Sequence, residues 1–190
     1  MLSACVENLL PGSGPPADLY TLTPKNTFAA DLPRARWQLV VEEPLASGGL
    51  NSERIALQTA PTRIEYFAGS QWTVRAPQMV QTLLVESFEN TERIISVGRQ
   101  AIGLRSDFNL LTELREFQAE YDPVRTAPIV RVRINAKLIR QPERAIVASR
   151  NFEARIEAEG SDMLSIVTAF DIALGKVLRR TVEWTLRTAS

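Results

Sequence analysis

The most regular alternation of apolar and polar residues lies in the second half of the chain. Over Ile129–Arg140 the two kinds of residue alternate as in a β-strand with one buried face and one solvated face. A turn at Gln141-Pro142-Glu143 leads to a second long strand pattern, Arg144–Glu157. These patterns predict a long antiparallel hairpin. The apolar face of its first strand comprises Val130, Val132, Ile134, Ala136 and Leu138.

Two stretches carry apolar residues at helical spacing. The first begins at Arg75-Ala76-Pro77, where the missing N–H of proline costs no hydrogen bond, and it ends near Asn90. The second begins at Ser161, the predicted N-cap, and extends to about Arg187. Its main apolar stripe covers about a third of the helix circumference. Charged residues on its other side exclude a membrane-spanning helix.

Shorter strand patterns precede these elements. Between Arg36–Glu42 and the strands that follow it, Pro44–Gly49 is predicted to be a loop. Asp107–Tyr121 is predicted to be a strand with a bulge, because neither of its faces alternates strictly. Together the elements predict an α+β fold, a mainly antiparallel sheet with two amphipathic helices packed on one face. The remaining predicted strands are Asp18–Leu22, Glu53–Gln58, Arg63–Phe67 and Ile94–Val97.

The first residues of the sequence have a different character. Leu2-Ser3-Ala4-Cys5 fits the bacterial lipoprotein pattern, in which small residues precede the cysteine that receives the lipid. Pro11–Pro16 is almost entirely proline and glycine and can build neither helix nor strand. We therefore expect residues 1–17 to be a lipobox remnant and a tether, with a reach of roughly 40 Å, and residues 18–190 to be one domain. Because no apolar signal segment precedes Leu2 in this sequence, an incidental cysteine is the alternative.

Composition excludes several classes of chemistry. The 190 residues include no histidine and one cysteine, and the 22 Lys and Arg residues balance 22 Asp and Glu residues. A Ser-His-Asp triad, a histidine-ligated zinc site, an internal disulfide and a four-cysteine cluster are therefore impossible. A net charge of zero argues against a nucleic-acid partner. Arginine far outnumbers lysine, but because the arginines are scattered we interpret this as a compositional bias.

No catalytic, cofactor-binding or metal-binding residues are predicted. The clusters of glutamates lie mostly on the polar sides of strands, which favours solvated faces over a paired-acid hydrolase. Arg131, Arg133 and Lys137 form a basic strip on one strand face. An anionic partner for this strip is one interpretation, but we favour pairing with Glu153 across the strands.

Two features are candidates for interaction. Trp72, placed in the loop before the first helix, is either an interaction anchor or, as we favour, a plug in the core. The last helix also has a second apolar flank, which could pack on a curled sheet or on a neighbouring subunit. We favour the subunit, and hence a homo-oligomer. The flank comprises Leu164, Ile172, Val182 and Leu186.

The order of several short motifs resembles one family, the ABC-type transport auxiliary lipoproteins, which include the paraquat-inducible protein C (PqiC) group. The similarity begins at the lipobox and extends almost to the C-terminus. The motifs are Leu2–Cys5, Leu19-Tyr20-Thr21-Leu22, Arg54-Ile55-Ala56-Leu57, Tyr66-Phe67…Trp72…Arg75-Ala76-Pro77, Phe88-Glu89-Asn90, Leu114…Phe117…Ala119…Tyr121 and Ala169-Phe170-Asp171…Ala173-Leu174.

This resemblance implies a non-enzymatic envelope lipoprotein that works with an ABC transporter permease and ATPase and with an MCE-domain protein to move lipids between the inner and outer membranes. Only Cys5 carries over as a site, the lipid attachment point. Val6 follows it in place of Asp, which is consistent with sorting to the outer membrane. The alternative function is a periplasmic shuttle that itself binds the lipid, at the helix–sheet interface or near Trp72.

Overall fold

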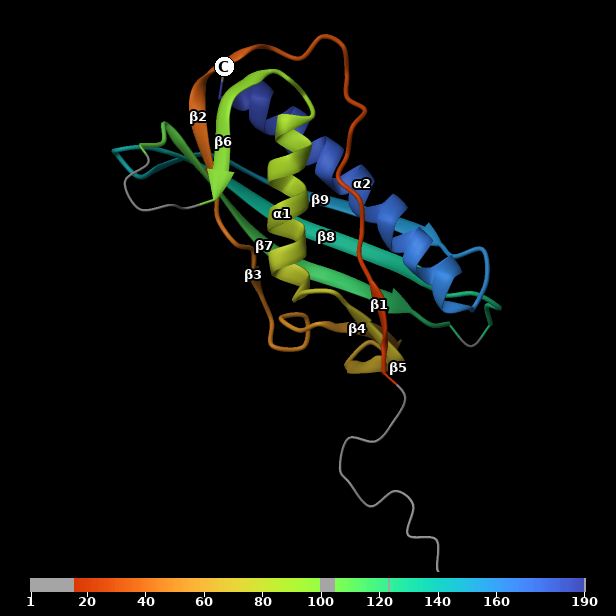
Figure 1. Ribbon diagram of the computed structural model, residues 1–190. Helices are drawn as coiled ribbons and strands as arrows, with labels where there is room; N and C mark the ends of the chain where they lie inside the picture. Colours follow the sequence, from red (N-terminus) through yellow and green to blue (C-terminus); the bar gives the residue numbers. More distant parts are fainter. Residues whose placement is uncertain (1–15, 100–104, 123, 190) are drawn as a thin grey trace, which may run out of the picture.

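The computed structural model describes residues 16–99, 105–122 and 124–189. Its strands all belong to one sheet, and its two helices pack against that sheet (Figure 1). In chain order the elements are β1 (Asp18–Tyr20), β2 (Ala35–Val41), β3 (Leu45–Ala46), β4 (Arg54–Ala60), β5 (Arg63–Trp72), α1 (Ala76–Glu89), β6 (Ile94–Arg99), β7 (Phe108–Glu120), β8 (Ile129–Arg140), β9 (Ala145–Glu157) and α2 (Met163–Thr188).

Three long strands form the centre of the sheet. β7 pairs antiparallel with β8, and β8 pairs antiparallel with β9 along nearly their whole length. The other edge of β7 is lined by β2, β3 and β4 one after another, all parallel to it. Beyond these, β6 pairs with β2, while β5 pairs with β4 and β1 with β5. The sheet is therefore mixed and mostly antiparallel, because the parallel pairings are the short ones, which confirms the predicted fold class.

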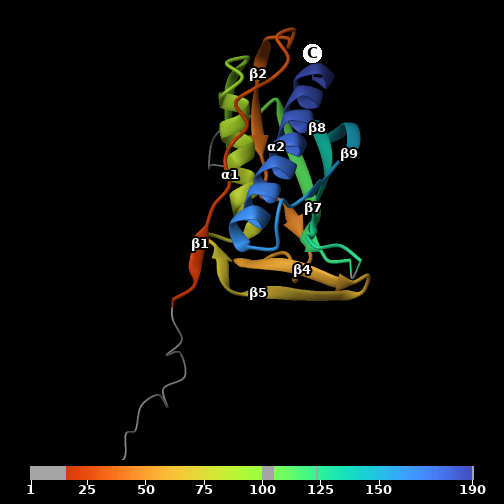
Figure 2. The same cartoon turned by 90° about the vertical axis from the view of Figure 1, so that its right-hand side faces the viewer.

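Both helices lie on the same side of the three long strands (Figure 2). α2 packs on β8 and β9, and α1 packs on β2, β6 and α2. Between β1 and β2 an extended segment, residues 21–34, crosses the outer side of the helices (Figure 1); we call it the strap. The helices are thus held between the sheet and the strap.

The core fills the space between sheet and helices. The predicted apolar face of β8 is buried at every position, from Val130 to Leu138. At the centre, Trp72, Phe117 and Phe170 form a triangle of rings whose centroids are 5.1 to 5.7 Å apart. Burial of three aromatic side chains in mutual contact contributes strongly to the stability of a domain of this size.

Several boundaries differ from the sequence predictions. β3 lies inside the predicted loop, where β7 supplies a pairing partner that local sequence cannot reveal. Trp72 ends β5 instead of lying in a loop, and its N–H donates to the carbonyl of Glu53 over 2.7 Å. The predicted N-cap Ser161 is wrong, because Asp162 caps α2 by accepting from the N–H of Ser165 over 3.0 Å. The predicted bulge in β7 is confirmed by a register shift between Leu114 and Glu116.

Candidate functional site

Of the sequence-predicted site residues, Cys5 lies outside the described residues, as does nearly all of the predicted tether. Trp72 is 1% exposed and sits in the aromatic triangle of the core. The core interpretation of Trp72 is therefore confirmed and the alternative of a surface anchor is wrong. Its large ring fills the junction between β5, β7 and α2, a position that no partner could reach.

The second apolar flank of α2 divides into two parts. Val182 and Leu186 are fully buried, so the expectation that they contact a second subunit is wrong. Leu164 and Ile172 are 68% and 45% exposed. The reason is that α2 packs against β8, β9 and α1, while the strap is bonded to its outer side, so its C-terminal half needs a wider apolar stripe than a helix lying on a sheet alone.

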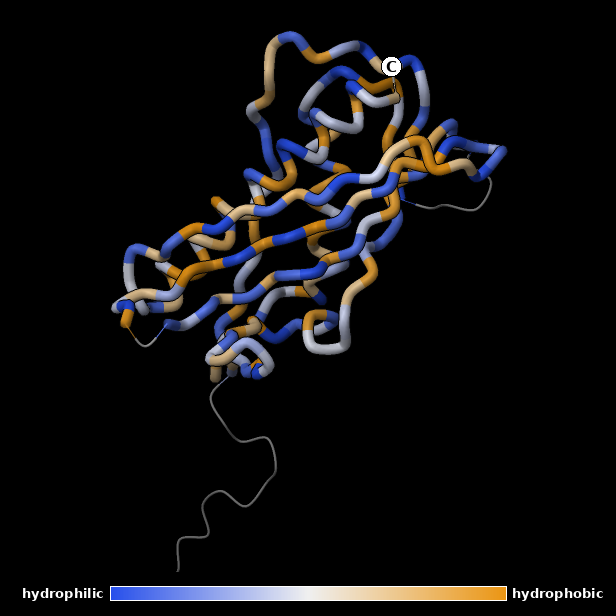
Figure 3. The backbone as a smooth tube through the Cα atoms, turned by 180° about the vertical axis from the view of Figure 1, so that it is seen from behind, coloured by the Kyte–Doolittle hydropathy of each residue, from blue (hydrophilic) through white to orange (hydrophobic). Residues whose placement is uncertain are grey.

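The sheet face that points away from the helices carries a network of ion pairs. Figure 3 shows the backbone of this face, seen from behind. The guanidinium of Arg131 bonds to Glu153 over 2.9 Å and to Glu120 over 3.3 Å. Arg133 bonds to Glu116 over 2.6 Å. Cross-strand pairing of the basic strip with Glu153 is thus confirmed for Arg131, while Lys137 is exposed and has no ion-pair partner among the described residues.

The electrostatics of this network favour the charged form of Arg131. Burial alone would lower the pKa of Arg131, but the hydrogen bond to Glu153 and the nearby carboxylates of Glu116 and Glu120 raise it above the usual value. Each of these three carboxylates is paired with an arginine of β8. The network therefore links β7, β8 and β9 across the solvated face of the sheet.

The part of the chain that the structure describes has neither a grouping of metal ligands nor a helix able to cross a membrane. Within residues 16–99, 105–122 and 124–189, no three acidic, histidine or cysteine side chains are grouped so as to hold a metal ion. Neither of the two helices found there combines the length and the apolar run that crossing a bilayer requires. What these residues do offer is a set of surface grooves.

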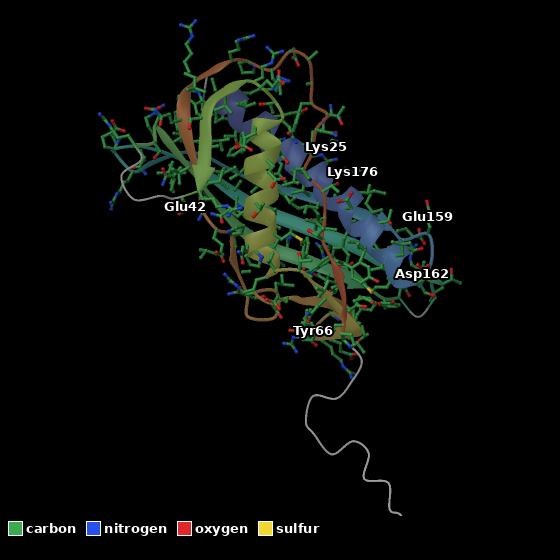
Figure 4. All side chains as sticks on the ribbon, in the orientation of Figure 1. Lys25, Glu42, Tyr66, Glu159, Asp162 and Lys176 are labelled. Carbon is green, nitrogen blue, oxygen red and sulfur yellow. The ribbon has the colours of Figure 1, made fainter. Side chains whose placement is uncertain are left out.

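One of these grooves, of about 650 Å³, lies between the strap and the helices, and we call it the strap groove. The strap forms one wall and the outer face of α2 forms the other, and Asn90, the residue after α1, also lines the groove. The side chains of Lys25 and Lys176 both line it and lie close together in Figure 4. Its lining residues are Thr23, Pro24, Lys25, Asn26, Asn90, Asp171, Ile172, Gly175, Lys176 and Arg179.

Hydrogen bonds from both helices fix the strap at this groove. The carboxylate of Asp171 accepts from the N–H of Thr23 over 2.7 Å and from its hydroxyl over 2.9 Å. The N–H of Lys25 donates to the hydroxyl of Ser87 over 2.9 Å, and its carbonyl accepts from the amide of Asn90 over 3.0 Å. Sequence analysis did not find this groove, because its parts come from segments far apart in the chain. The only local signal was the Phe88-Glu89-Asn90 and Ala169-Phe170-Asp171 motifs.

Comparison with known proteins assigns the family. The model of the ABC-type transport auxiliary lipoprotein component matches residues 20–182, which contain nearly all of the fold and every residue of the strap groove. The chain belongs to this family. The resemblance read from the sequence motifs is thereby confirmed. Such a component is not expected to be an enzyme, and a lipid-anchored position in the cell envelope is consistent with the family.

Individual proteins are also similar to this chain. The crystal structure of protein XCC0632 from Xanthomonas campestris is 31% identical, with a TM-score of 0.85 over 90% of this chain and 96% of that one. The hypothetical protein CT253 from Chlamydia trachomatis shares the fold, with a TM-score of 0.60 at 8% identity over 82% of this chain and 98% of that one. The uncharacterized protein bll6063 from Bradyrhizobium diazoefficiens is 26% identical over 92% of this chain, which spans about half the length of that relative.

Proposed function

We propose that this auxiliary lipoprotein is a non-enzymatic component of an ABC/MCE-type lipid-transport system. In this proposal it anchors or lines the periplasmic conduit between the inner and outer membranes. Its partners are an MCE-domain protein and the permease and ATPase of an ABC transporter. The observation that carries the proposal is the family match over residues 20–182.

The anchoring part of the proposal concerns the N-terminus. Cys5 carries the lipid, residues 1–17 act as the tether, and residues 18–190 form the single domain that meets the partners. The attachment site is the periplasmic side of a Gram-negative envelope, and the residue after Cys5 favours the outer membrane. Self-association into a homo-oligomer remains part of the proposal, through a surface other than Val182 and Leu186, which are buried.

Packing favours a scaffold over the alternative of a lipid shuttle. A shuttle must enclose acyl chains in an apolar cavity. Between sheet and helices the described domain instead has a filled core, with Trp72, Phe117 and Phe170 at its centre. The grooves at the strap, at the β4–β5 end, beside the β8–β9 turn and beside the C-terminal half of α2 are lined mostly by polar and charged side chains. They suit contacts with headgroups or proteins better than the enclosure of a lipid tail.

Co-purification after crosslinking in cells tests the proposal. The tagged chain is expected to bring down the MCE-domain protein and the transporter subunits, and its deletion is expected to weaken resistance to detergent. Cys5→Ser, with an exposed position such as Thr168→Ser as the matched control, is expected to shift the protein from the membrane fraction to the soluble fraction. Failure to capture either partner from crosslinked cells would contradict the proposal.

The same preparation distinguishes the shuttle. Native mass spectrometry of protein released from membranes is expected to show the chain without a bound lipid, apart from the lipid attached to Cys5. A stoichiometric, non-covalent lipid that survives delipidated buffers would instead favour the shuttle.

A further inference from the structure

Three cationic side chains line the strap groove. Lys25 comes from the strap, and Lys176 and Arg179 come from α2. Neither lysine ammonium group has a hydrogen-bond or ion-pair partner among the described residues. The chain as a whole has no net charge, but in the lining of this groove three cations stand against one carboxylate, that of Asp171, so the groove is a local concentration of positive charge.

The acidic residues near the groove offset only part of this charge. Asp171 is the acidic residue in its lining, and both of its oxygens already accept hydrogen bonds from Thr23. Arg179 donates a hydrogen bond from its Nε to the carboxylate of Glu183 over 2.9 Å. The two terminal nitrogens of its guanidinium remain available for a ligand. Lys25, Lys176 and Arg179 therefore carry three positive charges against the two negative charges of Asp171 and Glu183. The groove keeps a net positive charge, and both ammonium groups are free to bind a ligand.

The groove is also held in shape before any ligand arrives. The backbone of Lys25 is bonded to Ser87 and Asn90, so the base of this side chain is fixed relative to α1. Across the groove, Gly175 leaves room on α2, and an added Cβ there would lie 3.9 Å from the Cδ of Lys25. The aliphatic stem of Lys25 therefore lies against the part of α2 where Gly175 has no side chain. Such preorganisation lowers the entropy cost of binding.

The chemistry of the walls selects the kind of anion. Lysine ammonium groups are compact point charges that suit phosphate oxygens without demanding a planar partner. A peptide that adds along the strap would also need free backbone groups, but the N–H of Thr23 and both backbone groups of Lys25 are already bonded within the protein. Pro24 and the 45%-exposed Ile172 add apolar surface beside the charges, as a ligand with both a charged and an apolar part requires.

We propose that the strap groove binds the phosphate of an anionic glycerophospholipid headgroup, with Lys25 and Lys176 as the principal ligands and Arg179 as the third. Ile172 and Pro24 then contact the glycerol region, while the acyl chains stay outside the protein. This inference rests on the proposed role in lipid transport and names the lipid chemistry that the component would recognise. It is compatible with a scaffold, because an open groove holds a headgroup without enclosing the lipid.

Vesicle co-sedimentation tests the proposal. The chain is produced in the cytoplasm, so that Cys5 carries no lipid, and is mixed with vesicles of phosphatidylcholine alone or of equal parts phosphatidylcholine and phosphatidylglycerol. We expect binding to the anionic vesicles only. The double variant Lys25→Gln/Lys176→Gln is expected to weaken it about tenfold to thirtyfold, since each cation near a charged surface contributes to binding.

Lys137→Gln is the matched control, because it removes the third lysine from the opposite face of the sheet. It is expected to change binding by less than about twofold, and Lys25→Arg/Lys176→Arg is expected to retain most of it. Thermal unfolding is the control for folding, and all of these variants are expected to fold because the substituted side chains lie at the surface. If Lys137→Gln and the double variant lose the same amount of vesicle binding, the binding depends only on the overall charge of the protein, and the proposed site is overturned.

Two further arms separate the possible sources of failure. Inorganic phosphate and chloride of equal ionic strength are compared as competitors that release the protein from vesicles. If phosphate releases more protein while the two kinds of vesicle bind the protein equally well, the groove takes free phosphate and the lipid assignment is overturned. Co-purification of the double variant with its transport partners tests the proposed function separately. Intact co-purification with unchanged vesicle binding would refute the groove alone, whereas loss of partners from the wild-type chain would refute the wider role.

Discussion

The indole of Trp72 meets the ring of Phe170 edge to face, with the two centroids 5.3 Å apart and the planes at 83°. This contact joins the last residue of β5 to the N-terminal third of α2. Phe117 of β7 completes the triangle, so three elements far apart in the chain meet at one point. Removal of the indole would therefore affect the attachment of α2 as well as the local packing.

Trp72→Ala is expected to lower the free energy of unfolding by about 3–5 kcal/mol, the cost of a large cavity in a packed core. Urea denaturation followed by circular dichroism measures it. Trp37→Ala is the control, because Trp37 is only half-buried and makes a single edge contact with Phe108 at 5.2 Å. A loss for Trp72→Ala no larger than that for Trp37→Ala would contradict the central role of the triangle.

The flank of α2 gives a second prediction. Val182→Glu and Leu186→Glu each place an unpaired charge in a fully buried position, and each is expected to leave the protein largely unfolded or insoluble. Ile172→Glu and Leu164→Glu, at exposed positions of the same helix, are expected to shift the free energy of unfolding by no more than about 0.5 kcal/mol. Solubility and thermal melting of the four variants measure the difference. A folded Val182→Glu protein with altered assembly would restore the subunit interpretation.

Val182 and Leu186 show what a sequence pattern cannot determine. Periodicity predicted α2 and the buried face of β8 well, because both depend on neighbours close in sequence. It could not assign Val182, because an apolar flank looks the same whether the covering surface belongs to this chain or to another. The covering surface here is built from the sheet, α1 and the strap, which only the tertiary fold brings together.

The same reasoning explains the features that sequence analysis missed. β3 has two residues and exists because Leu45 and Ala46 pair with Glu113 and Leu114 of β7. The strap groove combines parts separated by up to about 150 positions, such as Thr23 and Asp171. Neither has a local signature, whereas the strictly alternating Ile129–Arg140 does. The sequence indicated function only through the family motifs. Two of these motifs contain Asn90 and Asp171, which bond to the strap.

The bond between Thr23 and Asp171 supports a third prediction. Asp171→Ala removes the acceptor for both donors of Thr23 and is expected to cost about 1–2 kcal/mol of stability. It is also expected to speed proteolytic cleavage within the strap, because one of its attachments to α2 is lost. Thr168→Ala, which removes only a hydroxyl bonded within its own helix, is the control. Cleavage at the wild-type rate in Asp171→Ala would show that the strap is held by its other contacts alone.

The last prediction concerns acid and the far end of the strap. Burial alone would raise the pKa of Glu183, but the hydrogen bonds from Arg179 and from the N–H of Ala29 outweigh it and hold the pKa below its usual value of 4.5. A carboxylate whose pKa is lower in the folded state binds protons more weakly there than in the unfolded chain. Its contribution to stability is therefore complete above pH 4.5 and is lost as the pH falls below 4.5 through the lowered pKa.

Glu183→Gln removes this titration while leaving an oxygen that can still accept from Ala29. We therefore expect the free energy of unfolding of this variant to fall less steeply than that of the wild-type protein as the pH is lowered from neutrality to about pH 3. Part of the slope will remain, because the bonds from the hydroxyl and N–H of Ser165 also lower the pKa of the helix cap Asp162. Asp162→Asn is thus the matched comparison, and the two losses of slope are expected to add because the residues lie at opposite ends of α2. If the free energy of unfolding depends on pH in the same way for Glu183→Gln and the wild-type protein, the charge of Glu183 does not contribute to holding the strap at Ala29.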